Sequence, residues 1–210
     1  MSIVFDQVTK KLGGNIVIDN ISCVIKSNHI TGLKGINGSG KTMMMRLIAG
    51  LIYPSSGSVV VDGKIMGKDI SFPPSIGVML ENPSFLNSYS GYENLKMLSD
   101  INKVISPSTI HETLFRVGLG DAERKKYRKY SLGMKQRLGI AAAIMEHPSI
   151  LLLDEPTNAL DTNGIILVKD IIREEKKRGA TIVISCHDTQ ILEDLADDIL
   201  FIEGGRIVNQ

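Results

Sequence analysis

Residues 35–42 constrain the fold more than any other segment of the chain. They read GINGSGKT and match the spacing Gly-x-x-x-x-Gly-Lys-Thr. The apolar run 30–34 predicts a strand before this segment, and the run 43–51 predicts a helix after it. Glycines at this spacing let the backbone curl with its N–H groups pointing inward, where they can bind phosphate. The alternative is a glycine-rich turn that matches by accident, and the flanking strand and helix argue against it.

The same segment carries the side chains that a bound nucleoside triphosphate needs. Lys41 would reach the β- and γ-phosphates, and the Thr42 hydroxyl would ligate Mg²⁺. The N-terminus of the helix would add partial positive charge. We therefore expect a nucleoside triphosphate and Mg²⁺ as ligands, with the nucleotide bound by Gly35, Asn37, Gly38, Ser39, Gly40, Lys41, Thr42 and Met43.

Composition and charge narrow the class of protein. The chain has 210 residues, 43% hydrophobic and 22% charged, which is typical of one globular domain, with or without subdomains. A net charge of +1 gives no reason to expect a nucleic-acid partner. The two cysteines do not form a disulfide framework, no signal peptide is recognisable, and no apolar run reaches the roughly 18 residues that span a bilayer. We expect a soluble, cytoplasmic protein that works at a membrane only through another chain.

Both ends of the chain predict β structure. Residues 3–8 and 21–26 alternate apolar and polar side chains, with Ile3, Phe5 and Val8 as the inward set. Residues 56–64 predict a strand followed by a tight turn at Asp62-Gly63, and residues 199–208 predict a hairpin that turns at Gly204-Gly205. The sequence therefore predicts antiparallel β structure around the phosphate loop and a hairpin at the end.

The middle of the chain predicts helices. Apolar residues at 92, 95, 98 and 101 form one stripe, and Ile110, Leu114 and Val117 form another that stops at Gly118. The basic run 124–129 is interpreted as a solvated surface face rather than a phosphate or partner site. Three consecutive methionines, 43–45, are interpreted as core residues rather than as a soft-metal site.

Two continuous apolar runs, 150–155 and 181–186, predict buried strands of a parallel sheet. Helices are expected over 132–146 and 164–178. Asp154 and Glu155 end the first run, so Asp154 can hold Mg²⁺ while Glu155 acts as the base that orients the attacking water. His187 follows the second run at the same sheet edge and could contact the γ-phosphate. The plainer alternatives are two acids that begin a turn and a histidine at the surface.

Several motifs in order resemble the nucleotide-binding domain of the ATP-binding-cassette (ABC) family. GINGSGKT resembles its Walker A motif, ILLLDEP its Walker B motif, and YSLGMKQRLGIA its signature. NALD resembles the D-loop, and SCHD resembles the switch region with its histidine. The resemblance covers the chain from about residue 3 to residue 208. It implies an α/β fold with a P-loop NTPase (RecA-like) core, a mostly parallel sheet, an antiparallel β subdomain and an inserted helical subdomain.

The resemblance also implies a domain organisation, partners and a mechanism. One domain, 1–210, would comprise a β subdomain and ATPase core (1–82 and 136–210) and a helical subdomain with the signature (83–135). Two cassettes would pair head to tail with two ATP molecules between them, and Ser131 and Gly133 would contact the γ-phosphate of the ATP bound to the other copy. Lys41, Glu155 and His187 would be the catalytic residues. A separate transmembrane permease would hold the chain at the inner face of the cell membrane.

Two residues depart from the family pattern. Glu81 stands where the family has a glutamine, so a carboxylate would join Thr42 and Asp154 near the metal. Leu12 stands near the position of the aromatic residue that stacks on adenine, and it offers apolar contact without a ring. Glu81 and the SLGMKQR signature resemble the bacterial bacitracin and lantibiotic-immunity exporters. A soluble ATP switch of the same fold and a non-hydrolysing nucleotide-binding module are the alternatives.

Overall fold

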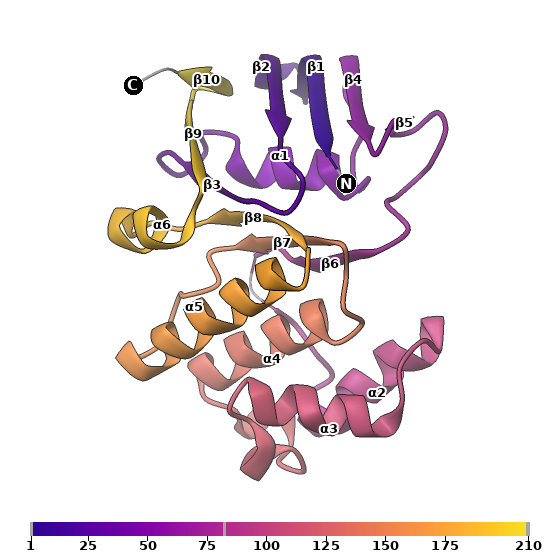
Figure 1. The fold of residues 1–210 in the computed structure, drawn as a ribbon, viewed down its shortest axis with the longest axis vertical. Helices are drawn as coiled ribbons and strands as arrows, with labels where there is room; N and C mark the ends of the chain where they lie inside the picture. The colour runs from indigo at the N-terminus through magenta and orange to yellow at the C-terminus, as the bar shows by residue number, and fades with distance from the viewer. Residues whose placement is uncertain (1, 82, 209–210) are drawn as a thin grey trace.

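The computed structural model describes residues 2–81 and 83–208, which form two sheets and a set of helices (Figure 1). The strands are β1 (Ile3–Leu12), β2 (Asn15–Ile25), β3 (Ile30–Lys34), β4 (Ser56–Val61), β5 (Lys64–Ile65), β6 (Ile76–Met79), β7 (Ile150–Asp154), β8 (Thr181–Ser185), β9 (Asp198–Glu203) and β10 (Arg206–Val208). The helices are α1 (Lys41–Ile48), α2 (Gly91–Asn102), α3 (Pro107–Arg116), α4 (Leu132–Ile144), α5 (Thr162–Lys177) and α6 (Thr189–Leu195), with short 3₁₀ turns η1 (Gly120–Ala122) and η2 (Tyr127–Lys129).

The larger sheet has the strand order β10-β9-β3-β8-β7-β6 and is parallel from β9 to β6. Only β10 runs antiparallel, because the hairpin turns at Gly204 and Gly205, whose φ angles are 54° and 79°. The predicted mostly parallel sheet and its terminal hairpin are thus confirmed. β6 was not predicted as a strand. It is four residues long and contains Gly77, where a Cβ would lie 1.8 Å from the Ala143 carbonyl oxygen of α4.

The smaller sheet is antiparallel, with the order β2-β1-β4-β5. Ile3, Phe5 and Val8 of β1 are buried, as predicted. The inward positions shift from odd to even residues because the pairing of β1 with β2 is irregular between Phe5 and Val8. Gln7 has a positive φ of 47° at this point, as expected for a bulge that adds one residue to a strand.

The parallel sheet is covered on both faces, as its continuous apolar strands predict. On β7, Ile150 and Leu152 belong to a core that includes α1 and the antiparallel sheet, whereas Leu151 and Leu153 belong to a second core with α4 and α5. Figure 1 shows α1 between the two sheets and α4 and α5 on the opposite face of the parallel sheet. Met44 and Met45 of α1 are completely buried, which supports their interpretation as core residues.

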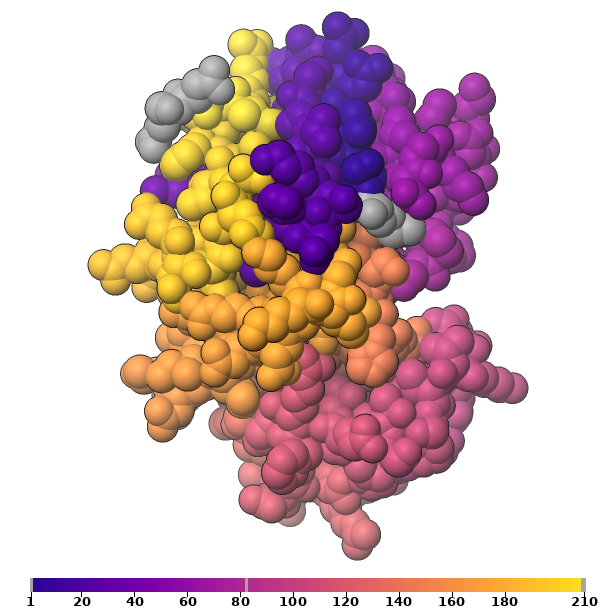
Figure 2. Space-filling model, in the orientation of Figure 1, coloured from indigo at the N-terminus to yellow at the C-terminus, as the bar shows by residue number. Residues whose placement is uncertain are grey.

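The helices α2 and α3 lie at the end of the molecule farthest from the antiparallel sheet (Figures 1 and 2). The α3 stripe of Ile110, Leu114 and Val117 is buried, as predicted. The predicted helix α2 is present and Leu95 of its stripe is buried, but the prediction was wrong for the second half of the stripe, because Ile101 is 75% exposed and Leu98 is 37% exposed. The inward face of α2 is instead formed by Gly91, Asn94, Leu95 and Ser99.

A buried amide explains this rotation of α2. Asn94 accepts a hydrogen bond from the Leu86 N–H (2.9 Å) and donates to the carbonyls of Leu86 (3.2 Å) and Ser90 (2.8 Å). Asn94 therefore satisfies the backbone of the loop before α2 and faces inward in place of an apolar side chain. The basic residues 124–126, 128 and 129 are exposed, in agreement with their interpretation as a solvated face.

Candidate functional site

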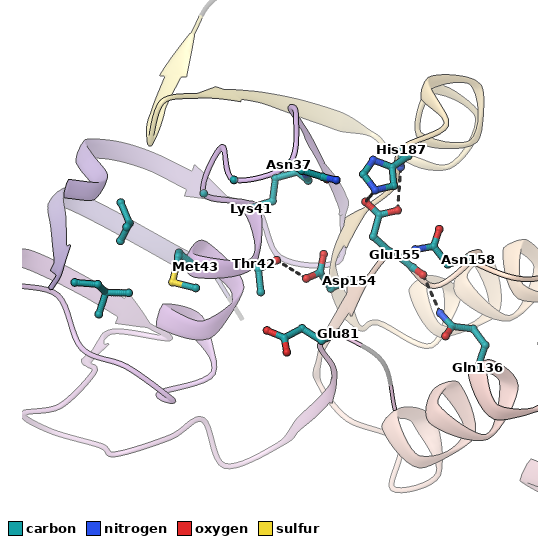
Figure 3. Close-up of a pocket in the computed structure, with 14 residues that line it drawn as sticks. Asn37, Lys41, Thr42, Met43, Glu81, Gln136, Asp154, Glu155, Asn158 and His187 are labelled. Carbon is teal, nitrogen blue, oxygen red and sulfur yellow. Dashed lines mark hydrogen bonds and ion pairs between the residues drawn. The ribbon is translucent and has the colours of Figure 1, made fainter. Parts of the chain in front are cut away.

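A cavity of about 570 Å³ lies at the carboxyl ends of the parallel strands (Figure 3). The phosphate loop follows β3, Asp154 ends β7 and His187 follows β8, so the topology brings these segments to one sheet edge. The cavity is lined by Leu12, Val17, Asn37, Gly38, Gly40, Lys41, Thr42, Met43, Glu81, Gln136, Asp154, Glu155, Asn158 and His187. Eleven predicted site residues are in this set. Gly35, Ser39, Ser131 and Gly133 are not.

The phosphate loop requires glycine at defined positions. Gly38 and Gly40 have positive φ angles of 79° and 117°, which other residues rarely adopt. A Cβ at Gly35 would lie 2.2 Å from the Ile202 carbonyl oxygen. The Gly205 N–H donates to the Ser39 carbonyl at 2.9 Å and so joins the loop to the β9–β10 hairpin. Gly35 and Ser39 thus shape the loop without lining the cavity.

The donors of the loop suit an anion. No side chain caps the N-terminus of α1, so the N–H groups of its first turn are available to phosphate. Lys41 is 6% exposed, and its ammonium donates to the carbonyls of Gly35 (2.7 Å) and Ile36 (3.1 Å). The Ser39 hydroxyl is buried and has no hydrogen-bond partner among the described residues. Free N–H groups at a helix N-terminus beside a buried ammonium are the arrangement that a phosphate would complete.

The oxygen ligands for a cation meet at the start of α1. The Thr42 hydroxyl donates to Oδ2 of Asp154 at 2.5 Å, and the Ser185 hydroxyl donates to Oδ1 of the same carboxylate. Hydroxyl and carboxylate oxygens are ligands that Mg²⁺ prefers. Within residues 2–81 and 83–208, no group of three or more His, Cys, Asp or Glu side chains is arranged to hold a metal ion.

Glu155 and His187 face each other at one end of the cavity (Figure 3). The His187 N–H donates to Oε2 of Glu155 at 3.0 Å, and the His187 Nε2 lies 3.4 Å from Oε1. Oε1 is buried and has no hydrogen-bond partner among the described residues. Burial raises the pKa of Glu155 above its usual value, and the nearby His187 opposes this rise. A carboxylate with a raised pKa at the edge of a phosphate-binding cavity is suited to accept a proton.

Comparison with known proteins identifies the family. Residues 18–158 match the family model described as "ABC transporter". The chain belongs to the ABC transporter family. Similar proteins include an uncharacterized ABC transporter ATP-binding protein, YybJ, of Bacillus subtilis, with 49% identity over 96% of this chain and 92% of the relative. Others are the lantibiotic transport ATP-binding protein SrtF of Streptococcus pyogenes (38%, covering 96% and 87%) and the bacitracin transport ATP-binding protein BcrA of Enterococcus faecalis (38%, covering 98% and 67%).

A solved structure described as the ATP-binding subunit of an ABC transporter has the same fold. It superposes with a TM-score of 0.88 at 22% identity and covers 99% of this chain and 88% of that chain. The expected fold class and the resemblance to the bacitracin and lantibiotic transport proteins are therefore confirmed. Across the described part of the chain, no helix has the length and apolar character needed to cross a membrane.

Ser131 and Gly133 of the ABC signature do not line the cavity of their own chain, although Gln136 of the same motif does. Ser131 is exposed and caps α4, with its hydroxyl accepting from the Met134 N–H at 3.2 Å. Gly133 is in the first turn of α4, where a Cβ would lie 3.0 Å from the Ala159 carbonyl oxygen of the D-loop.

The two residues that depart from the ABC pattern both line the cavity. Leu12, at the end of β1, forms an apolar wall with Val17 and Met43. Glu81 follows β6 near Thr42 and Asp154 (Figure 3), and its carboxylate forms an ion pair with Arg46 of α1.

Four residues at the site were not predicted from the sequence. Val17 and Asn158 line the cavity, and Gln136 donates from Nε2 to the Glu155 carbonyl at 2.8 Å. Ser185 contacts both acids, because its hydroxyl also accepts from the Glu155 N–H at 3.0 Å. Gln136 and Asn158 are within the signature and D-loop motifs and could have been selected there. Ser185 is likewise the first residue of the SCHD motif, whereas Val17 is an ordinary strand residue whose sequence gives no such signal.

Proposed function

We propose that this chain hydrolyses ATP to ADP and phosphate, as the ATPase subunit of an exporter whose membrane-spanning subunit is a separate chain. One observation carries the proposal. The Glu155 carboxylate lies beside the His187 ring and has a raised pKa, and it directly follows Asp154, which accepts a hydrogen bond from the Thr42 hydroxyl. A module that only binds nucleotide would not need a base in this position.

The proposed chemistry assigns a role to each residue. Lys41 and the N–H groups of the loop bind the phosphates, and Thr42 and Asp154 would hold Mg²⁺, with Glu81 near it. When bound, Mg²⁺ supplies positive charge to the phosphate oxygens. Glu155 accepts a proton from the attacking water, and its pKa sets the acid limit of turnover, because a protonated carboxyl cannot act as a base. The backbone N–H of His187 donates to the Glu155 carboxylate and holds it in place. The His187 ring would contact the γ-phosphate.

The complete site is proposed to need a second copy of the chain. Ser131 and Gly133 at the N-terminus of α4 would contact the γ-phosphate bound to the partner copy in a head-to-tail dimer, because a helix N-terminus attracts anions. In this proposal residues 83–135 form a helical subdomain that presents the signature, and residues 1–82 and 136–210 form the β subdomain and ATPase core.

Export and a permease partner are supported by the relatives' descriptions. SrtF is described as a lantibiotic transport protein and BcrA as a bacitracin transport protein. A chain that works with a permease in this way would be held at the inner face of the cell membrane. Purification of the tagged protein from its own membranes tests this point. A hydrophobic multi-span protein should accompany it, whereas recovery without one would favour the soluble ATP switch.

Substitution of the base tests the reaction. Glu155→Gln should bind ATP as the parent does, lose about 10²- to 10⁴-fold in turnover and accumulate a dimer when ATP and Mg²⁺ are present. Phosphate release and size-exclusion chromatography measure these effects. Glu112→Gln, an exposed glutamate on α3, is the matched control and should retain parental turnover. Near-normal ATPase activity in Glu155→Gln would remove Glu155 from the role of base.

A further inference from the structure

Arg46 is placed to control the side chain of Glu81. Arg46 follows Thr42 by four residues on α1, so both side chains are on the same face of the helix, one turn apart. The Thr42 hydroxyl contacts Asp154, whereas the Arg46 guanidinium contacts the Glu81 carboxylate. One helix face therefore presents a proposed metal ligand and, next to it, the cation that holds the third carboxylate of the cavity.

The charges that line the cavity indicate what the ion pair between Arg46 and Glu81 does. Three carboxylates line it, Asp154, Glu155 and Glu81, and Lys41 is the only lysine or arginine among its described lining residues. A nucleoside triphosphate adds further negative charge at the same place. An unpaired carboxylate at Glu81 would repel that charge, and the repulsion is strongest when no divalent cation is present. Arg46 neutralises Glu81 from outside the cavity lining.

The pair is also free to exchange partners. The Glu81 side chain is 62% exposed and that of Arg46 is 32% exposed, so their contact is a surface ion pair. Such pairs contribute little to folding stability, so the contact can open at small cost. Glu81 follows β6, with a positive φ of 60°, and its carboxylate lies near Thr42 and Asp154 (Figure 3). A modest change in side-chain rotamers would therefore be enough to turn it towards them.

We propose that Arg46 is a positioning residue that holds the Glu81 carboxylate in the nucleotide-free protein and competes with Mg²⁺ for it. The inference rests on the proposed Mg²⁺–ATP site and adds to it a residue that sets its metal dependence. Two cations that share one carboxylate oppose each other's binding, because occupation by one removes the ligand of the other. Arg46 thus strengthens the binding of a nucleotide without metal, because it neutralises the Glu81 carboxylate. It also weakens Mg²⁺ binding relative to a site in which Glu81 has no such partner.

A double-mutant cycle measures this coupling without relying on turnover. Binding of the non-hydrolysable ATP analogue AMP-PNP is measured by calorimetry in EDTA and across a Mg²⁺ titration. Arg46→Met keeps the aliphatic stem and removes the charge. It should weaken binding in EDTA by about five- to tenfold and lower the Mg²⁺ concentration needed for half-maximal tight binding. In a Glu81→Gln background the same substitution should change neither quantity.

Two variants complete the design. Arg46→Lys retains a positive charge and should restore most of the parental binding in EDTA. Thermal unfolding of Arg46→Lys and Arg46→Met shows whether each variant is folded. Arg173→Met removes an exposed ion pair with Asp194 outside the cavity and should match the parent throughout.

The outcomes are distinct. An effect of Arg46→Met that depends on Glu81 supports the proposal. No effect, or an equal effect with glutamate and with glutamine at position 81, overturns it, because Arg46 then does not act through the carboxylate. Failure of the parent to bind AMP-PNP under any condition would instead overturn the proposed function, and this inference with it.

Discussion

The two parts of the proposed ATP site differ in how firmly their side chains are held. At the phosphate end, Lys41 and Asp154 are each 6% exposed, and Ser185 behind them is fully buried. At the signature, Ser131 is exposed and Leu132 is 70% exposed. The first region is organised by hydrogen bonds within one chain, whereas the second presents a helix N-terminus and an apolar side chain to the surroundings.

This difference indicates which region can act alone. Electrostatic stabilisation requires groups that are already oriented before the reaction, and the phosphate end meets that requirement. Burial of an exposed leucine against another protein surface is energetically favourable, so this side chain favours association at the helix N-terminus. We therefore expect one chain to bind ATP through its phosphate end and two chains to be needed for rapid hydrolysis.

The largest expected effect comes from mixing two inactive variants. Lys41→Ala and Ser131→Arg should each lose at least about 100-fold in ATPase activity. In a mixed head-to-tail dimer, one of the two sites combines an intact Walker region with an intact signature. A 1:1 mixture should therefore recover about a quarter of parental activity, since half of the dimers are mixed and each has one intact site.

A second mixture serves as the control for site sharing. Lys41→Ala and Glu155→Gln damage the same half of the site, so neither site of their mixed dimer is intact and no activity should return. If the Lys41→Ala and Ser131→Arg mixture is no more active than the separate variants, the signature does not complete a partner's site.

A smaller effect is expected from Ser185, which supports the phosphate end from behind. Its hydroxyl donates to Asp154 and accepts from the Glu155 N–H at 3.0 Å. Ser185→Ala should lower kcat about tenfold and the free energy of unfolding by about 1–3 kcal/mol, because both acids lose a buried partner. Ser185→Thr, which keeps a hydroxyl, should recover part of the activity.

Ser99→Ala separates positioning from stability in this experiment. Ser99 is also buried, and its hydroxyl donates to the Lys96 carbonyl in α2, outside the cavity. It should lower stability while leaving kcat unchanged. If Ser185→Ala likewise loses stability with no change in kcat, the hydroxyl is structural and does not position the acids.

The phosphate end could be predicted from the sequence because its residues are specified locally. The glycine spacing of the loop determines its backbone conformation. The continuous apolar strand before Asp154 brings this residue to the carboxyl edge of the parallel sheet, whatever position the strand has in the strand order. The contacts of Ser185 and Arg46 depend on packing between distant segments. Arg46 and Glu81 are brought together by the position of β6 relative to α1. The local sequence around either residue does not specify that the two side chains meet.

The error in α2 has a similar physical origin. Residues 92, 95, 98 and 101 have helical spacing, but spacing cannot reveal that Asn94 satisfies three hydrogen bonds of a neighbouring loop. The polar side chain then takes an inward position and leaves Leu98 and Ile101 outside. Apolar periodicity predicts an inward face well only where no buried polar group competes for it.

The smallest effect is expected at the wall of the cavity farthest from the chemistry. Leu12 is 41% exposed and packs beside the cavity with Val17 and Met43, so it offers apolar contact to a base but no ring. Leu12→Tyr should raise the affinity for ATP relative to GTP by about two- to tenfold, because a ring stacks on the adenine. Calorimetric titration of both nucleotides measures the ratio. Ile16→Tyr places the same ring on the β1–β2 hairpin outside the cavity and should leave the ratio unchanged. An unchanged ratio in Leu12→Tyr as well would show that the base is bound elsewhere, so that only the phosphate end would fix the position of the nucleotide.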